Sequence, residues 1–105
     1  MASKSLPVSP AITFAIVQRK VVTALRNGSF SAEARNNINV KNLLVTGAVT
    51  VPALIQILSG CSSENWSHSP HHDDPLVTLH VLSPGGWYVK FYFVDPDTVF
   101  ISVHR

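Results

Sequence analysis

Four side chains near the end of the chain combine residue types that move protons and bind phosphate. They are His80, Tyr88, Lys90 and His104. Imidazoles suit proton transfer because an ordinary pKa of about 6.5 leaves both of their forms populated near neutral pH. Cleavage of RNA without a metal needs one group to remove the proton of the ribose 2′-hydroxyl and another to protonate the leaving 5′-oxygen. It also needs a cation to stabilise the charge that builds on the phosphate.

These side chains belong to three segments that alternate apolar and polar residues, as strands of a half-buried sheet do. The segments are 76–82 ("LVTLHVL"), 87–94 ("WYVKFYFV") and 98–104 ("TVFISVH"). The sequences "SPGG" and "DPD" between them are typical of turns. The sequence therefore predicts a three-stranded antiparallel meander at the end of the chain.

The last hairpin sets which side chains face each other, because successive residues of a strand point to opposite faces. If the aliphatic and aromatic residues of 87–94 and 98–104 share one core, the loop between them must have an odd length. A three-residue loop, 95–97, meets this condition. The expected cross-strand pairs are Val89–Val103, Lys90–Ser102 and Tyr88–His104.

The same argument, applied to the first hairpin, places Val77, Leu79 and Val81 on the core face and the loop at 83–85. It predicts that Thr78 lies opposite Lys90 and that His80 lies opposite Tyr88. His80, Tyr88 and His104 would then form one row across the sheet, with side chains about 4.5–5.5 Å apart at Cβ. Polar sheet faces also occur where a sheet simply faces water. Two imidazoles, two phenols and an amine without an acid favour an anionic ligand.

The residue types suggest a role for each member of this site. His80 and His104 would be the acid–base pair, in either order, and Tyr88 would orient the phosphate or donate a proton. Lys90 and Arg105 would hold the phosphate. Single-stranded RNA commonly stacks its bases on aromatic rings, and the candidate rings are Trp66, Trp87 and Tyr92.

The ending "WYVKFYFVDPDTVFISVHR" resembles the last hairpin of the MqsR family of messenger-RNA interferase toxins, which have a RelE-like fold. Tyr88, Val89 and Lys90 match the family's Tyr-aliphatic-Lys strand, and "ISVH" matches its aliphatic-Ser-aromatic-Lys strand with His104 at the lysine position. "SSENWSHS" is similar to the family's helix-ending segment and puts His68 at another lysine position. "LHVLSP" resembles its first sheet strand, with His80 near a polar functional position.

The resemblance covers roughly the last 45 residues. It implies a metal-independent endoribonuclease that cleaves messenger RNA to a 2′,3′-cyclic phosphate and a 5′-hydroxyl, without a cofactor. It also implies neutralisation by a cognate antitoxin protein. If the family's lysines hold phosphate, His68 and His104 bring less fixed charge and more acid–base capacity to these positions, and His68 becomes an RNA-binding candidate.

Helices are expected before the meander. Ser9 and Pro10 begin a helix that Gly28 ends, and Thr50, Pro52 and Gly60 delimit a second helix. The expected core-facing residues of the two helices are Ile12, Ala15, Ile16, Val21, Val22, Leu25, Val51, Leu54, Ile55 and Leu58. Residues 29–46 fit either a strand or a weak helix. The prediction is an α+β fold in which N-terminal helices pack on the C-terminal meander.

Composition limits the class of protein. The 105 residues are 46% hydrophobic and 13% charged, which predicts a single folded domain, 1–105, with 1–9 as a flexible lead-in. A formal charge of +2 permits an anionic partner without requiring one. The single Cys61 excludes an internal disulfide and favours a reducing compartment. The chain carries no signal-peptide pattern and no apolar run of membrane-spanning length, so we expect a cytoplasmic protein.

Two other classes of function stay open on the sequence. Segment 61–75, "CSSENWSHSPHHDDP", is expected to be a polar, solvated loop that could also contact RNA. Its His68, His71 and His72 are legitimate metal ligands for a metal-dependent hydrolase. Their adjacent spacing is not that of a zinc signature. Alternatively, the domain is non-catalytic and binds a protein partner through the face or edge of its sheet.

Overall fold

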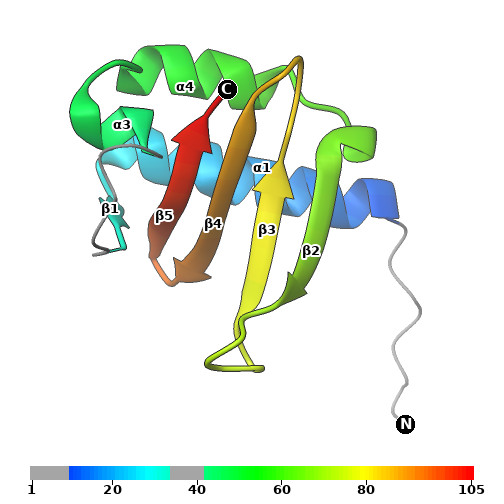
Figure 1. Cartoon of the computed structure of the whole chain (residues 1–105). Helices are drawn as coiled ribbons and strands as arrows, with labels where there is room; N and C mark the ends of the chain where they lie inside the picture. Colours follow the sequence, from blue (N-terminus) through cyan, green and yellow to red (C-terminus); the bar gives the residue numbers. More distant parts are fainter. Residues whose placement is uncertain (1–9, 34–41) are drawn as a thin grey trace, which may run out of the picture.

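The computed structural model describes residues 10–33 and 42–105, in which helices cover one face of a sheet (Figure 1). The helices are α1 (Pro10–Asn27), α3 (Leu43–Thr46), α4 (Val51–Ser59) and the 3-10 helix η1 (Ser63–Asn65). The strands are β1 (Phe30–Ala32), β2 (Trp66–Pro70), β3 (Thr78–Leu82), β4 (Tyr88–Val94) and β5 (Asp97–His104). They lie in the order β1-β5-β4-β3-β2, with β1 parallel to β5 and all other neighbours antiparallel.

Helix α1 ends where the sequence predicts, because Gly28 has a φ of 74° that favours glycine. Its buried stripe differs from the prediction. Ile16, expected in the core, is 48% exposed, whereas Phe14 and Val17 are buried. The Phe14 ring packs against Trp66 with centroids 6.5 Å apart. Ser9 and the 1–9 lead-in lie outside the described residues.

Helix α4 confirms the predicted start and stop. The Thr50 hydroxyl accepts a hydrogen bond from the Ala53 amide at 3.2 Å, as an N-cap does. Leu54 and Leu58 are fully buried, and the neighbouring apolar residues of α4 are partly buried against the same core. This core lies between α1, α4 and the sheet, and its largest fully buried members include Leu25, Leu54, Leu58, Leu82, Phe91 and Phe100.

The predicted three-stranded meander is incomplete. Segment 61–75 is not a loop throughout, because β2 pairs along its length with β3, from Trp66–Leu82 to Pro70–Thr78. β2 is an edge strand and pairs with one neighbour only. Its side chains are mostly polar, so the sequence shows no apolar–polar alternation that would have indicated a strand. Residues 30–32 form the parallel strand β1, and residues 43–46 form the helix α3. The sequence had left strand or helix open for 29–46, and these two parts are now assigned.

The last hairpin reaches the predicted pairs by a different route. The turn contains only residues 95–96, since Val94 lies opposite Asp97. The register then shifts beside Lys90, where Ile101 has no partner in β4. Such a bulge restores the parity that the shorter turn had changed. The predicted pairs Val89–Val103, Lys90–Ser102 and Tyr88–His104 are therefore confirmed.

The predicted register of the first hairpin is wrong. The observed pairs are His80–Phe91, Val81–Lys90 and Leu82–Val89. Six residues, 83–88, separate the paired Leu82 and Val89, and this even number places Leu82 rather than Val81 on the helix-covered side. Leu82 is fully buried there. His80 follows it onto the same side, because the two are separated by two positions.

The mixed helix and sheet content confirms an α+β fold. The finer description is wrong in two respects: the sheet has five strands of mixed direction, and α3 and α4 follow β1 instead of preceding all strands. Likeness to the RelE fold stays a prediction. None of the helices in 10–33 and 42–105 is both long and apolar enough to cross a membrane.

Candidate functional site

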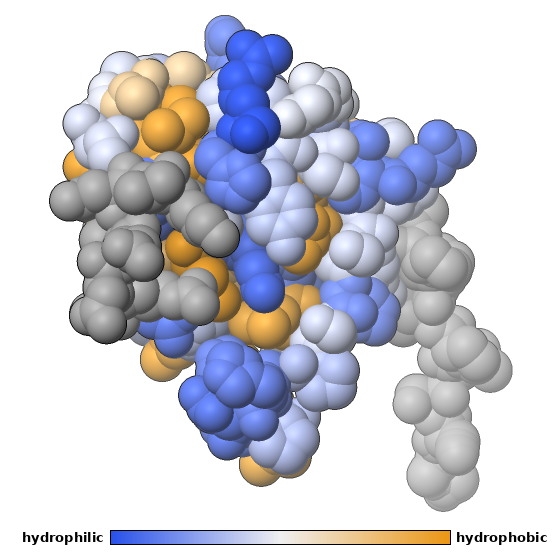
Figure 2. Space-filling view, viewed as in Figure 1, coloured by the Kyte–Doolittle hydropathy of each residue, from blue (hydrophilic) through white to orange (hydrophobic). Residues whose placement is uncertain are grey.

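The sheet face that α1 and α4 leave uncovered carries the candidate site. We call it the open face, and its polar members on the two central strands are Tyr88, Lys90, Tyr92, Ser102 and His104. They alternate with the core residues Val89, Phe91 and Val103, and Figure 1 shows α1 and α4 on the opposite side of the sheet. Figure 2 shows hydrophilic surface at the end of this face where β5 finishes and again at the β2–β3 turn, with hydrophobic surface between them.

Tyr88 and His104 are in direct contact on the open face. Their rings stack with centroids 5.1 Å apart and an interplanar angle of 29°. The His104 Nδ1 lies 3.2 Å from the backbone oxygen of Arg105. Since that oxygen can only accept, Nδ1 donates, and Nε2 of the neutral ring keeps its lone pair. His104 is thus oriented to take up a proton at Nε2. On β4, Lys90 is the next residue after Tyr88 on this face.

Arg105 lies beside this pair, not within it. Its guanidinium carbon is 5.1 Å from the centroid of the Trp87 ring, a cation–π geometry. Trp87 is itself packed against the core. The expected phosphate-holding residue and one expected stacking ring are therefore engaged with each other at the end of the strands.

A second group of side chains meets at the other end of the open face. The His71 ring contacts the Tyr92 ring edge-on, with centroids 5.4 Å apart. Burial raises the pKa of Tyr92, and the charge of Glu33 and a side-chain hydrogen bond with Glu33 raise it further. Glu33 follows β1 and its amide donates to the Phe100 carbonyl at 3.0 Å. An acid therefore borders a face that the sequence suggested had none.

Sequence reasoning missed Glu33 and did not place His71 beside Tyr92. Alternation from Phe30 places Glu33 on the opposite face of β1, but nothing in the sequence predicts that β1 joins the sheet beside β5. His71 reaches Tyr92 because β2 is a strand, and the residue that follows it contacts a ring of β4. Both contacts depend on pairing between segments far apart in the chain.

His80 does not join the row with Tyr88 and His104. It is 8% exposed on the helix-covered side, where its Nδ1 accepts a hydrogen bond from Trp66 Nε1 at 3.1 Å. Burial, followed by the charges of His68 and Lys20, lowers the pKa of His80 from 6.5 to about 4. The ring is therefore neutral at neutral pH, and it lies on the wrong side of the sheet for the expected acid–base pair.

Trp66 and His68 lie on the same side as His80. The Trp66 ring stacks on His68 with centroids 4.8 Å apart and also packs against Phe14. His68 itself is exposed on the edge strand. The two expected RNA-binding residues are thus together, but they are separated from the open face by the sheet.

The turn after β2 brings His71, His72 and Asp73 together, with one ligand atom from each within 4.8 Å of the others. The hydrogen bonding does not suit a metal. The Asp73 amide donates to His71 Nδ1 at 3.0 Å, so the proton of the neutral ring is on Nε2 and no free lone pair remains. Metal-bound histidines usually donate their second nitrogen's proton instead. Metal binding would first require this hydrogen bond to break.

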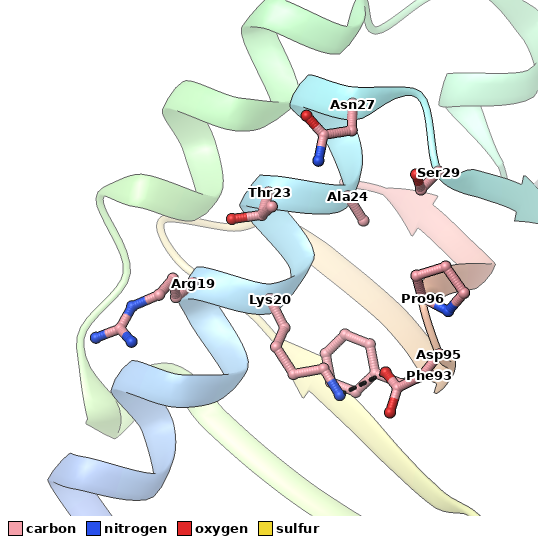
Figure 3. Close-up of a pocket in the computed structure, with 9 residues that line it drawn as sticks. All are labelled: Arg19, Lys20, Thr23, Ala24, Asn27, Ser29, Phe93, Asp95 and Pro96. Atoms are coloured by element: carbon pink, nitrogen blue, oxygen red, sulfur yellow. Dashed lines mark ion pairs between the residues drawn. The ribbon is translucent and has the colours of Figure 1, made fainter.

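Two further features lie outside the open face. A hollow of about 370 Å³ between α1 and the β4–β5 turn contains Lys20, which reaches toward Phe93 and Asp95, while Arg19 points away (Figure 3). The Lys20 Nζ is 2.7 Å from an Asp95 oxygen, so this cation is already paired. Burial raises the pKa of Cys61 to about 11, which disfavours a thiolate nucleophile.

The comparisons with known proteins give no family. No family model matches the chain, and neither a curated protein nor a solved structure matches it.

Proposed function

We propose that the protein is a metal-independent endoribonuclease whose active site is the open face around Tyr88, Lys90 and His104. The observation that carries the proposal is the ring contact between Tyr88 and His104, 5.1 Å between centroids, beside Lys90 on a face without a helix. The substrate is single-stranded RNA, because a sheet face with half-buried aromatic rings can receive unstacked bases and a backbone together.

The proposed reaction uses these side chains in defined roles. His104 Nε2 takes the proton of the ribose 2′-hydroxyl, and the 2′-oxygen attacks the phosphorus as the bond to the 5′-oxygen breaks. Tyr88 donates its phenolic proton to that leaving oxygen, and Lys90 stabilises the negative charge on the phosphate. The products are a 2′,3′-cyclic phosphate and a 5′-hydroxyl. Transfer of the proton from His104 back to Tyr88 through solvent completes the cycle.

The MqsR-like sequence of the last hairpin supports a more specific role. In that role the protein is a toxin that cleaves messenger RNA in the cytoplasm and is held inactive by a cognate antitoxin protein. His104 in place of a lysine fits a base at this position, and the confirmed pairing of Tyr88 with His104 and of Lys90 with Ser102 is compatible with it. His80 is left out of the mechanism.

The test is cleavage of a labelled single-stranded RNA in excess chelator. We expect the wild type to cleave and to leave cyclic phosphate ends, and we expect His104→Ala and Tyr88→Phe each to lose at least about 100-fold in kcat. His72→Ala, at the exposed turn, is the matched control and should keep full activity. Expression of the wild type should arrest growth, and His104→Ala should relieve the arrest.

Cleavage that disappears with chelator would contradict the metal-independent mechanism. Cleavage that survives in His104→Ala would remove the proposed base. RNA binding by a folded wild type without cleavage would favour the non-catalytic interaction domain.

A further inference from the structure

We propose that Tyr92, Glu33 and His71 form a nucleobase subsite on the open face, which selects a base carrying an exocyclic amino group over uracil. The proposal rests on the proposed function, since it requires RNA on this face. It assigns a recognition role to two residues, Glu33 and His71, that take no part in the proposed cleavage.

Three separate parts of the chain build this subsite. Tyr92 projects from the middle of β4, His71 comes from the β2–β3 turn, and Glu33 follows β1. The His71 backbone is fixed by its amide, which donates to the Val77 carbonyl at 2.8 Å. The Glu33 backbone is fixed beside β5 by its 3.0 Å hydrogen bond to Phe100. Because the three side chains come from three parts of the chain, their relative positions depend on the pairing of the sheet and not on one flexible loop.

The position of the subsite fits one nucleotide next to the proposed cleavage centre. Tyr92 and Lys90 are two residues apart on one strand, so their side chains lie about 6.6–7 Å apart on the same face. A phosphate at Lys90 therefore leaves room for a neighbouring base at Tyr92. The strand of RNA would run along β4, with its next sugar toward Tyr88 and His104.

The chemistry of the three side chains fits a base and rejects a phosphate. Tyr92 offers a ring for stacking, which is tolerant of base identity. The Glu33 carboxylate repels a phosphate and can only accept hydrogen bonds, so it favours amino groups such as N4 of cytosine. Glu33 is close enough to Tyr92 for its charge to raise the pKa of the phenol, so the carboxylate borders the stacking ring.

The third side chain supplies a donor. Because His71 Nδ1 accepts from the Asp73 amide, its Nε2 carries the ring proton and can donate to a base carbonyl. Cytosine and uracil both have such a carbonyl, and they differ at position 4, where one has an amine and the other an oxygen. Discrimination between them therefore depends on Glu33, whereas His71 contributes to the binding of both.

The test measures binding without cleavage, using 2′-O-methyl oligocytidylate and oligouridylate of equal length with the full chain. We expect the wild type to bind oligocytidylate roughly tenfold more tightly, the size of one hydrogen bond to a charged group. Glu33→Gln should abolish this preference, because an amide can also donate to the uracil oxygen. His71→Ala should weaken both ligands, and Glu64→Gln, at an exposed position in η1, should change neither.

Each outcome decides the question. Equal binding of the two oligonucleotides by the wild type would overturn the subsite while leaving RNA binding on the open face intact. A preference that persists in folded Glu33→Gln would overturn the role of the carboxylate. Failure of both oligonucleotides to bind would contradict the subsite together with the proposed function.

Discussion

His80 and His104 show how the same residue type acquires opposite properties from its surroundings. His80 accepts a hydrogen bond from Trp66 and is surrounded by the rings of Phe91 and Phe93. His104 stacks on Tyr88 at the open face and keeps its Nε2 lone pair. The first arrangement stabilises a neutral ring in the interior, and the second leaves a ring ready to accept a proton.

Acid should destabilise the fold through His80. Its folded pKa of about 4 lies below the ordinary 6.5, so between these values the unfolded chain binds more protons than the folded one. The contribution of neutral His80 to the free energy of unfolding is therefore complete above pH 6.5. It is lost as the pH falls toward 4, by up to about 3 kcal/mol. Urea denaturation at pH 7.5 and 4.5 should show this loss.

The matched variant for this prediction is His80→Gln, which can still accept from Trp66 but does not titrate. It should lose markedly less stability between the two pH values than the wild type. His72→Gln, at the exposed turn, should behave as the wild type. Equal pH dependence in His80→Gln and the wild type would show that other groups cause the acid effect.

At the scale of elements, the short segment before α3 connects the helical layer to β5 through one buried side chain. Asn42 is 0% exposed. Its Oδ1 accepts from the Val45 amide at 3.2 Å, and its Nδ2 donates to the Phe100 carbonyl at 3.5 Å. One amide thus caps α3 and ties it to the sheet, using both a donor and an acceptor.

Substitutions at Asn42 should separate these two contacts. Asn42→Ala should cost about 1–3 kcal/mol of unfolding free energy, because it removes the cap of α3 and the side-chain hydrogen bond to the Phe100 carbonyl. Asn42→Asp keeps the acceptor, but it cannot donate to Phe100 when ionised and buries a charge, so it should cost more. Thr50→Ala, which removes only the cap of α4, should cost about 1 kcal/mol. Urea denaturation at pH 7 gives the three values, and a milder effect of Asn42→Asp would contradict the account.

Element type was more predictable than strand pairing. The ends of α1 and α4 follow from local signals, namely Thr50, Gly28 and Gly60, which act within one turn. The face of each strand depends on non-local parity, and one residue changes it. The predicted three-residue turn and the observed two-residue turn with a bulge at Ile101 give the same pair of Tyr88 with His104. In the first hairpin, an even number of residues between the paired Leu82 and Val89 puts His80 on the other side.

At the scale of the molecule, a helical layer covers one face of the sheet and leaves the other for the candidate site. The sequence predicted the part of the candidate site that one hairpin forms, namely Tyr88, Lys90 and His104. Glu33 and His71 escaped prediction because they arrive from β1 and from the turn after β2. No local pattern encodes a parallel strand that joins at the sheet edge.

The small charge of the open face predicts weak salt dependence of RNA binding. Within the described residues, Lys90 is the cation on the central strands of this face, and Arg105 lies at the end of β5 over the Trp87 ring. Release of one or two counterions from single-stranded RNA gives a slope of about −0.7 to −1.4 when the logarithm of the binding constant is plotted against the logarithm of the salt concentration. Lys90→Ala should reduce the slope by about 0.7, while Lys20→Ala, on the helix side and paired with Asp95, should leave it unchanged. A steep slope in the wild type would place the RNA on another surface.

The two tryptophans give two separate parts of the molecule their own optical reporters. Trp66 lies against two imidazoles on the helix side, and protonated imidazoles quench indole emission. Trp87 lies under the Arg105 guanidinium at the end of the strands, next to Tyr88. Replacing one indole at a time by phenylalanine would let fluorescence follow acidification through Trp66 and nucleotide arrival through Trp87, in the same molecule and without an attached dye.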